Sequence, residues 1–262
     1  DISILEGSRE VLQKVRISGG GRCNVTHDQD DPRAFAQFYP RGSSALIGPL
    51  HRWRQSDTVA WFSAHGVELK AEDDGRMFPV SNRSSTVVDC LQQTARGLGI
   101  SVTTGVAVHG IEAHPGGGLR IATRDKEDIL ADAVLIATGG VRNNMARAPV
   151  DSIQHAIEPP VPSLFTFRID DPELVELAGI SVASATMRVS GSGLTANGPV
   201  LVTHWGLSGP AVLRISAWGA RELEACNYRF KLQVDWSGGT ESEVSLRSKF
   251  SSQRQSHGAR RV

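Results

Sequence analysis

The chain has 262 residues, 40% of them hydrophobic and 21% charged, a composition typical of a globular protein rather than a disordered one. Its formal net charge is zero and its pI is near 7.3, so nothing electrostatic indicates a nucleic-acid or membrane partner. No apolar run approaches the roughly 20 residues of a membrane-spanning helix. The N-terminal segment has neither the basic nor the apolar part of a signal peptide.

The three cysteines are far apart in the sequence, at Cys23, Cys90 and Cys226. An odd number at such spacing predicts neither a disulfide framework nor a zinc site, and the eight histidines also lack metal-ligand spacing. We therefore expect no metal and a reducing, cytoplasmic environment. A small-molecule substrate is the expected partner, and the sequence leaves the oligomeric state open.

The first part of the chain begins with a strand pattern and continues with helices. Residues 1–6 alternate apolar and polar side chains and predict a short strand that ends at Glu6. Three successive glycines, Gly19-Gly20-Gly21, then predict a loop without regular structure. Apolar residues at helical spacing predict helices over residues 35–39, 45–53, 59–65 and 84–98.

Three strand patterns follow the last of these helices. They cover residues 100–112, 119–123 and 129–137, and Gly116-Gly117-Gly118 turns the chain between the first two. A strand, helices, a hairpin and a further strand in this order predict an α/β domain with an antiparallel excursion.

A rigid joint of prolines at Pro159, Pro160 and Pro162 marks the expected domain boundary. Beyond it we predict a β-rich second domain over residues 159–237, with one helix over residues 211–223. Its expected strands cover residues 164–169, 180–189, 199–203 and 228–234. Residues 238–262 lose all apolar periodicity, and we expect a disordered tail there.

The run Ser18-Gly19-Gly20-Gly21-Arg22-Cys23-Asn24 is the first candidate for chemistry, and we call it the glycine loop. Glycines let the backbone approach a flat or phosphorylated ligand, and their N–H groups can form an anion-binding nest. Arg22 could pair with a phosphate, and Asn24 could bond a heterocycle edge. The alternative is a flexible loop with a solvated arginine, and the residues alone do not decide between the two.

Two further positions fit a nucleotide site. A buried strand running into Thr138-Gly139-Gly140 is a place where backbone meets a cofactor closely, although a strand-ending turn explains it too. Glu6 stands where a dinucleotide fold places the acid that binds the adenosine ribose. No glycine-rich turn precedes Glu6 in this sequence, and without that turn the residues favour an ordinary surface glutamate.

The second half contains one misleading pattern and one unusual block. Gly191-Ser192-Gly193-Leu194-Thr195-Ala196 matches G-x-G-x-x-A, but no helix pattern follows, so we predict a hairpin turn. In the block from Thr203 to Pro210, His204 could donate a proton or face a ligand. A tight turn entering a helix at Pro210 explains the same residues.

Taken in order, these blocks resemble the BaiN/YhiN-like flavoproteins, also described as NAD(P)/FAD-dependent or aminoacetone-oxidase-family enzymes. The resemblance covers about residues 1–236 and also rests on Gly75-Arg76-Met77-Phe78-Pro79-Val80 and Pro159-Pro160-Val161-Pro162-Ser163-Leu164. It implies a partial two-dinucleotide-binding (Rossmann-like) FAD domain over residues 1–158 and a β-rich insert domain, in a chain incomplete at both ends.

The resemblance also implies roles for individual residues. Glu6 would hold the adenosine ribose, the glycine loop would line the pyrophosphate and flavin, and Thr138, Gly139 and Gly140 would pass close to the cofactor. His204 is the candidate substrate-facing residue. The implied activity is FAD-dependent oxidoreduction, in which hydride moves between NAD(P)H or an organic substrate and the flavin. The alternative is a non-catalytic, truncated remnant of such a flavoprotein, at most a folded or partner-binding module.

Overall fold

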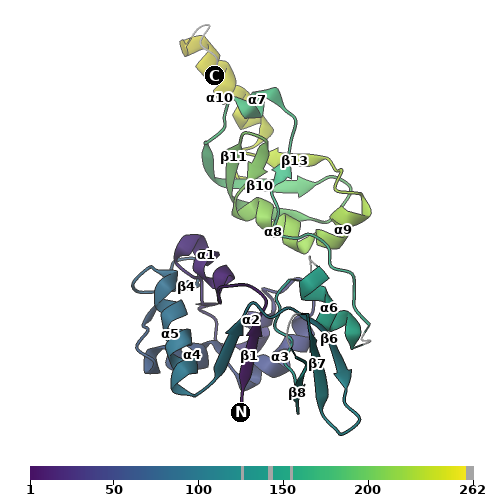
Figure 1. Cartoon of the computed structure of the whole chain (residues 1–262). Coiled ribbons are helices and arrows are strands. Elements are labelled where there is room, and N and C mark those ends of the chain that lie inside the picture. Colours follow the sequence, from purple (N-terminus) through teal and green to yellow (C-terminus); the bar gives the residue numbers. More distant parts are fainter. Residues whose placement is uncertain (125–126, 141–143, 154–155, 258–262) are drawn as a thin grey trace. The chain divides into compact units, whose positions relative to one another are not determined.

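The computed structural model describes residues 1–124, 127–140, 144–153 and 156–257. The chain divides into two compact units, unit 1 (residues 1–158) and unit 2 (residues 159–262), and each is described by itself (Figure 1). Unit 1 is a Rossmann-like domain and unit 2 is a β-rich domain, as the sequence predicted. Among the described residues, no helix is both long enough and apolar enough to span a bilayer.

Unit 1 contains short strands in three small sheets and six helices among its described residues. The elements in chain order are β1 (Ser3–Glu6), α1 (Gln13–Gly21), β2 (Thr26–His27), α2 (Pro32–Ala36), α3 (Ser43–Arg52), α4 (Gln55–Ala64), β3 (Leu69–Ala71), β4 (Arg76–Pro79), α5 (Ser84–Gly97), β5 (Ser101–Thr104), β6 (Val108–Ala113), β7 (Leu119–Thr123), β8 (Ile129–Ala131) and α6 (Asn144–Ser152). The sheets have the strand orders β1-β5, β2-β4-β3 and β6-β7-β8.

The parallel pair β1 and β5 is the part of unit 1 that most resembles a dinucleotide-binding sheet. Its register places Glu6 beside Thr104 at the carboxyl end of the pair. Ile4 and Val102, which pair with each other, are exposed on it, at 44% and 43% of their surface. Parallel strands are normally buried on both faces, so this two-stranded sheet leaves apolar surface uncovered.

Two of the predicted strands of unit 1 differ from the observed ones. The strand expected over residues 100–112 is divided into β5 and β6, because Gly105 takes a φ of +68° between them. The strand expected over residues 129–137 ends at Ala131, and Leu135 is 91% exposed. The apolar sequence of residues 133–137 makes a buried strand only beside a partner strand, and no strand of the described chain pairs with it.

The glycine loop lies against the small antiparallel sheet β2-β4-β3, which the sequence did not predict. Thr26 pairs with Met77, and Lys70 pairs with Phe78. Helix α5 follows the predicted pattern and buries Val87 and Val88. The amphipathic faces of these elements share an apolar cluster whose buried members are Cys23, Phe62, Val67, Val87 and Cys90.

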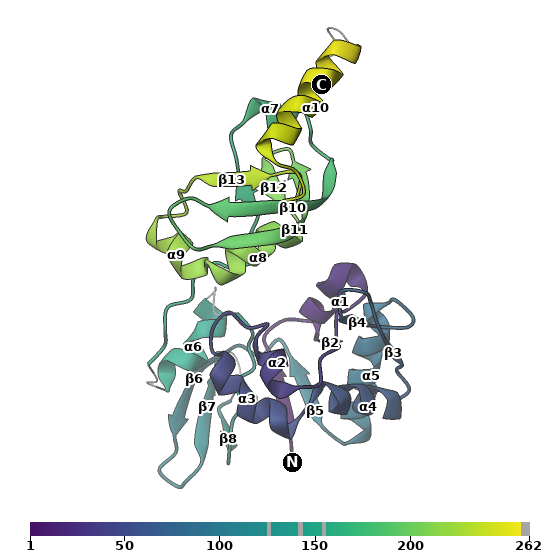
Figure 2. The ribbon, with the colours of Figure 1, turned by 180° about the vertical axis from the view of Figure 1, so that it is seen from behind.

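Unit 2 is built on one five-stranded antiparallel sheet (Figure 2). The elements in chain order are β9 (Phe167–Arg168), α7 (Pro172–Val175), β10 (Ser181–Val189), β11 (Thr195–Thr203), β12 (Gly206–Ser208), α8 (Pro210–Trp218), α9 (Ala220–Ala225), β13 (Leu232–Asp235) and α10 (Glu243–His257). The strand order is β13-β10-β11-β12-β9. The G-x-G-x-x-A match forms the turn between β10 and β11, so the predicted hairpin is confirmed.

One face of this sheet carries the core of unit 2. Alternate residues of β10 and β11, such as Met187 and Val200, are fully buried, while their neighbours along the strand are partly or largely exposed. Helix α8 buries Val212 and Ile215 in the same cluster. Its first turn begins at Pro210, as expected. The helix predicted over residues 211–223 is divided at Gly219 into α8 and α9.

The described part of the tail differs from the disorder that the sequence predicted for residues 238–262. It contains α10, in which Lys249 pairs with Glu241. Val244 is 78% exposed and Phe250 is 52% exposed, so these apolar side chains of the helix are not buried. The helix instead has side-chain contacts within the tail. Figures 1 and 2 both show α10 projecting away from the sheet of unit 2.

Candidate functional site

The glycine loop leaves helical geometry at Ser18. Ser18 is extended, with a ψ of 149°, and Gly19, Gly20 and Gly21 then take φ values of 55°, 67° and 83°. Left-handed backbone of this kind is available to glycine at little steric cost. The loop closes when the Cys23 amide donates a 3.0 Å hydrogen bond to the Ser18 carbonyl. The predicted irregular loop is therefore confirmed, with a backbone that requires glycine.

Strand β4 fixes the far end of the glycine loop. The Val25 amide donates to the Met77 carbonyl at 2.9 Å, and the Asn24 side-chain amide, in the orientation its surroundings satisfy, donates to the carbonyls of Met77 and Thr26. The glycine loop and strand β4, which belong to two of the sequence blocks that carried the family resemblance, thus lie side by side. In this structure Asn24 binds backbone rather than a heterocycle edge.

Gly19 is the most tightly packed glycine of the loop. A Cβ at this position would lie 2.9 Å from the Asn24 backbone nitrogen and 2.9 Å from the ring of Phe78, which is fully buried. The Cys23 thiol is buried as well, in the apolar cluster with Phe62 and Val87. Gly19 and Cys23 therefore hold the loop on the core.

Gly20 and Gly21 have the opposite surroundings. No heavy atom lies within 4 Å of a Cβ built on either residue, and both residues are exposed. Two consecutive left-handed glycines with open space in front of them leave backbone that a phosphorylated ligand can approach closely. These residues fit a nucleotide cofactor such as FAD.

Arg22 is held over Phe78 by an acidic partner that the sequence did not reveal. Its guanidinium carbon lies 4.0 Å from the Phe78 ring centroid, and its Nη1 lies 2.5 Å from Glu72 Oε1. Arg76 also reaches Glu72, at 3.5 Å, and Asp74, at 2.7 Å. The cluster contains two cations and two anions, so the charge of Arg22 is compensated within the protein.

Asp74 shows the electrostatic effect of this cluster. Partial burial raises the pKa of Asp74, but hydrogen bonds from the backbone and guanidinium of Arg76 outweigh it and hold the pKa below its ordinary value of 3.8. The carboxylate therefore stays ionised at neutral pH and keeps Arg76 in place.

The turn Thr138-Gly139-Gly140 approaches the helix that precedes the glycine loop. A Cβ built on Gly139 would lie 2.5 Å from Lys14 Nζ, and Gly139 takes a φ of 75°. The structure therefore brings Lys14 and Gly139 together from distant parts of the sequence. Nothing in the local sequence pairs these residues, so only the tertiary structure shows the contact.

Glu6 stands at the end of β1, as predicted, and is half buried. Its Oε1 accepts a 2.8 Å hydrogen bond from the Ser8 amide, and its backbone carbonyl accepts from the Val106 amide. The carboxylate thus lies at the carboxyl edge of the parallel pair, where ligands bind in open α/β sheets.

His204 belongs to unit 2. It is exposed in the two-residue turn between β11 and β12, and Thr203 Oγ1 donates a 3.0 Å hydrogen bond to the Gly206 carbonyl across that turn. Within the described chain, His204 has no hydrogen bond or ion pair. The local structure is the tight turn that the sequence offered as the alternative.

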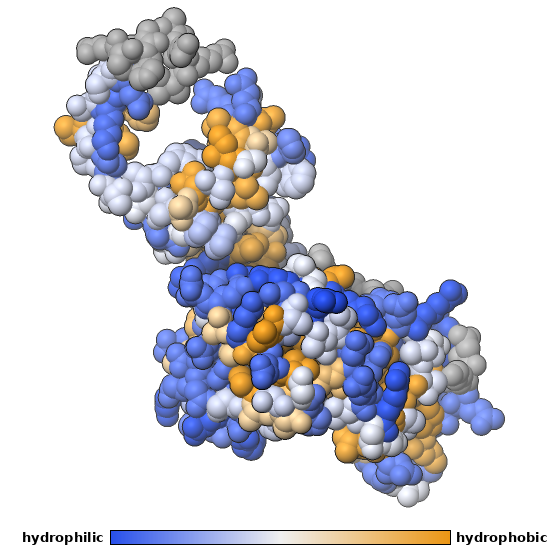
Figure 3. Space-filling model, turned by 90° about the vertical axis from the view of Figure 1, so that its left-hand side faces the viewer, coloured by the Kyte–Doolittle hydropathy of each residue, from blue (hydrophilic) through white to orange (hydrophobic). Residues whose placement is uncertain are grey.

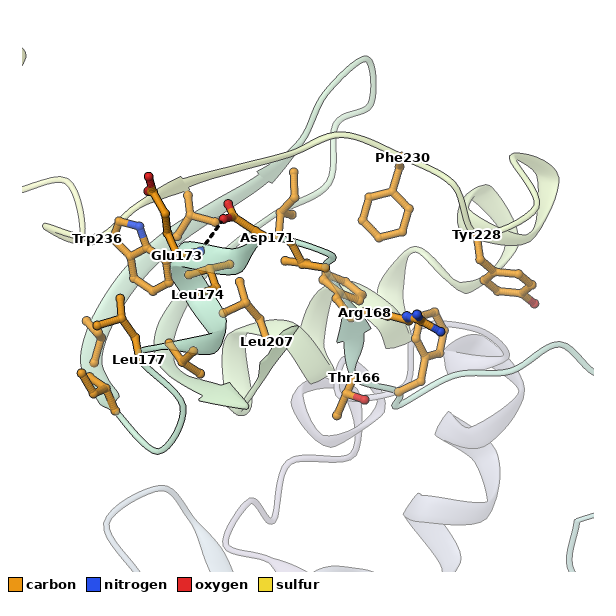
Figure 4. A pocket seen from close by; sticks show the side chains of 18 of the residues that line it. Thr166, Arg168, Asp171, Glu173, Leu174, Leu177, Leu207, Tyr228, Phe230 and Trp236 are labelled. Atoms are coloured by element: carbon orange, nitrogen blue, oxygen red, sulfur yellow. Dashed lines mark hydrogen bonds between the residues drawn. The ribbon is translucent and has the colours of Figure 1, made fainter. Parts of the chain in front are cut away.

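A cavity of about 1130 Å³ opens on the apolar face of the unit 2 sheet. Figure 3 shows hydrophobic side chains bordering a hollow in unit 2, and Figure 4 shows the cavity from close by. Leu174, Leu177 and Trp236 lie at one end, while Tyr228 and Phe230 lie at the other.

The charged groups of this cavity make local contacts. Asp171 accepts a hydrogen bond from the Glu173 amide and caps α7, and Arg168 pairs with Asp170. Glu173 and Arg229 also line the cavity, but most of its lining residues are hydrophobic, so hydrophobic contact is the main interaction that it offers a ligand. In the part of the chain that the structure describes, no three His, Cys, Asp or Glu side chains are grouped as metal ligands.

Comparison with known proteins agrees with the two-unit organisation. Residues 1–152 match the HI0933-like protein Rossmann domain, and residues 161–262 match the HI0933-like protein barrel and H2TH domain. These two matches cover most of the chain and correspond to unit 1 and unit 2.

Three curated relatives are similar to the chain at low identity. A 3-dehydro-bile acid delta(4,6)-reductase from Clostridium scindens is 24% identical over 90% of this chain. Ribosomal RNA dihydrouridine synthases from Escherichia coli and Haemophilus influenzae are 26% and 24% identical over 86% and 82% of it. The chain spans 58%, 57% and 55% of the lengths of these relatives. The chain therefore belongs to the HI0933-like protein family.

Proposed function

We propose that this chain contributes the FAD site of a flavin-dependent reductase, in which NAD(P)H reduces the flavin and an organic substrate then takes up the hydride. The observation that carries the proposal is the open, left-handed backbone of Gly20 and Gly21 on a loop that β4 supports. The Thr138-Gly139-Gly140 turn lies against Lys14, on the helix that leads into this loop. When bound, FAD supplies the two-electron carrier.

The residues of unit 1 have distinct roles in this proposal. Gly20 and Gly21 offer open, left-handed backbone to the phosphates, and Gly19 fixes that backbone on Phe78. Glu6, at the edge of the parallel pair, accepts hydrogen bonds from the adenosine ribose. Arg22 is held by Glu72, so we assign it to the structure of the loop as well as to the ligand.

The names of the relatives suggest a substrate class. A delta(4,6)-reductase acts on carbon–carbon double bonds, and a dihydrouridine synthase produces a uridine with two added hydrogens. We propose that this protein reduces a carbon–carbon double bond conjugated to a carbonyl group. One carbon of the double bond takes up the hydride and the other takes up a proton. We keep exposed His204 as the candidate substrate-facing residue.

Absorbance spectroscopy of the purified chain tests the cofactor first. The chain is incubated with excess FAD and desalted, and retained flavin bands of altered shape are the expected result. NADH and NADPH are then added without oxygen, and each is scored by the loss of the oxidised flavin band. Re-oxidation is finally tested with a conjugated steroid ketone and with a uridine-containing RNA.

The outcomes separate the parts of the proposal. A folded chain that loses all colour refutes FAD binding by this polypeptide and favours the non-catalytic alternative. Retained flavin that neither double-bond substrate re-oxidises refutes the substrate class while leaving the flavin site. Turnover that is unchanged by His204→Ala removes His204 from the site.

A further inference from the structure

Lys14 lies directly against the backbone of Gly139. A Cβ on Gly139 would lie 2.5 Å from Lys14 Nζ and 3.8 Å from Cε, so the ammonium group occupies the space that any larger residue would need. Gly139 also takes a φ of 75°, which glycine adopts readily. The ammonium of Lys14 is therefore placed on the turn that follows the apolar residues 133–137.

The charge of Lys14 differs from the charges of the neighbouring arginines. Arg22 is paired with Glu72, and Arg76 is paired with both Glu72 and Asp74. Within the described residues, no carboxylate lies within ion-pair distance of Lys14. Lys14, whose ammonium lies against Gly139, is thus a cation with no acidic side-chain partner among the described residues, as is Arg16 on the same helix.

We propose that Lys14 is an additional cofactor-binding residue, whose ammonium group binds the diphosphate of FAD at the Gly139 turn. The inference rests on the proposed function, because it names a residue of the same site. A diphosphate would supply the negatively charged partner that Lys14 does not have in the described chain. An ammonium group also offers three hydrogen-bond donors to the diphosphate oxygens. The isoalloxazine ring of oxidised FAD is uncharged and would gain much less from Lys14.

The test compares three variants of the full chain with three ligands. Lys14→Met removes the charge and Lys14→Arg keeps it. Lys70→Met is the matched control, because Lys70 is an exposed lysine of the same unit, on β3. Binding of FAD, of ADP and of riboflavin is measured by calorimetry or flavin fluorescence, since ADP contains the diphosphate and riboflavin lacks phosphate.

Lys14→Met is expected to raise the Kd for FAD and for ADP about tenfold, as the loss of one charge-assisted hydrogen bond would do. Its Kd for riboflavin should stay within about twofold of that of the unsubstituted chain, since no charged contact is lost there. Lys14→Arg should retain most of the affinity, and Lys70→Met all of it. The melting temperature should be nearly unchanged, because Lys14 is exposed. Added salt should weaken FAD binding to the unsubstituted chain more than to Lys14→Met.

Each other outcome has a distinct meaning. If Lys14→Met binds FAD and ADP as the unsubstituted chain does, the inference is overturned and the proposed function stands. If riboflavin binding falls as much as FAD binding, Lys14 acts on the ring and the diphosphate assignment is wrong. If ADP binds in a Lys14-dependent way while FAD is not retained, the inference stands and the proposed function fails. If neither FAD nor ADP binds the unsubstituted chain, both are overturned.

Discussion

Alanine substitutions at Gly19 and Gly20 test how the glycine loop is held in place. The two glycines are adjacent and have similar backbone angles, with φ values of 55° and 67°. They differ in what a Cβ would meet: Gly19 faces the Asn24 backbone nitrogen and the buried Phe78 ring at 2.9 Å, and Gly20 faces open space. The pair therefore separates backbone strain from steric contact at one site.

The expected magnitudes follow from these contacts. A side chain in left-handed backbone costs about 1–2 kcal/mol, and both variants have this cost. Gly19→Ala must also displace the Phe78 ring or the loop, and overpacking of this kind costs about 1–3 kcal/mol more. We expect the free energy of unfolding to fall by about 1–2 kcal/mol in Gly20→Ala and by about 2–5 kcal/mol in Gly19→Ala.

Urea unfolding followed by the fluorescence of Trp61 measures both values. Trp61 is half buried and packs against the cluster that contains Cys23, so it reports on unit 1. The other four tryptophans of the chain are replaced by phenylalanine, so that unit 2 adds no signal. Equal destabilisation of the two variants would refute the steric argument at Gly19, and so would a larger loss in Gly20→Ala.

Three further changes have expected outcomes. Leu207→Ala should lower the free energy of unfolding of unit 2 by about 2–5 kcal/mol in a denaturant titration, because Leu207 is fully buried. Hydrogen bonds from Ser237 lower the pKa of Asp235, so its carboxylate stabilises the folded chain above the ordinary pKa of 3.8 and loses this effect as the pH falls through the lowered value. Asp235→Asn should therefore reduce the acid dependence of stability. Cys226 is exposed, and burial raises the pKa of Cys90, so Cys226→Ser should remove the fast phase of labelling by a thiol reagent.

Each of these changes has a matched control on the same chain. Leu201→Ala lies on the exposed face of β11 and should cost less than Leu207→Ala; an equal loss would contradict the burial argument. Asp132→Asn removes an exposed carboxylate and should leave the acid dependence unchanged. If fast thiol labelling persisted in Cys226→Ser, one of the two buried cysteines, Cys23 or Cys90, would have to be accessible in solution.

Local patterns predicted the secondary structure well where the neighbouring sequence was sufficient. The amphipathic spacing of α5 fixes which of its faces is buried, and the alternation along β10 does the same for that strand. Residues 133–137 show the limit of such patterns. They have the composition of a buried strand, but a strand exists only when another strand pairs with it, and residue type alone does not show whether one does.

In the candidate site, likewise, some features could be predicted from the sequence and others could not. The three glycines of the glycine loop could be identified from the sequence because left-handed backbone is a property of the residue itself. Glu72 beneath Arg22 and Lys14 beside Gly139 could not be identified, because these contacts join residues that are distant in the chain. Side-chain charges meet only after the sheets and helices have packed.

The sequence by itself therefore determined the family, the fold class and the backbone positions at which a cofactor can come close. The tertiary structure decided which charges remain uncompensated there: Glu72 pairs with Arg22, and no acidic side chain of the described chain pairs with Lys14. The physical reason is that glycine conformation and amphipathic periodicity are local properties. Electrostatic compensation depends on distance in space, and packing alone sets that distance.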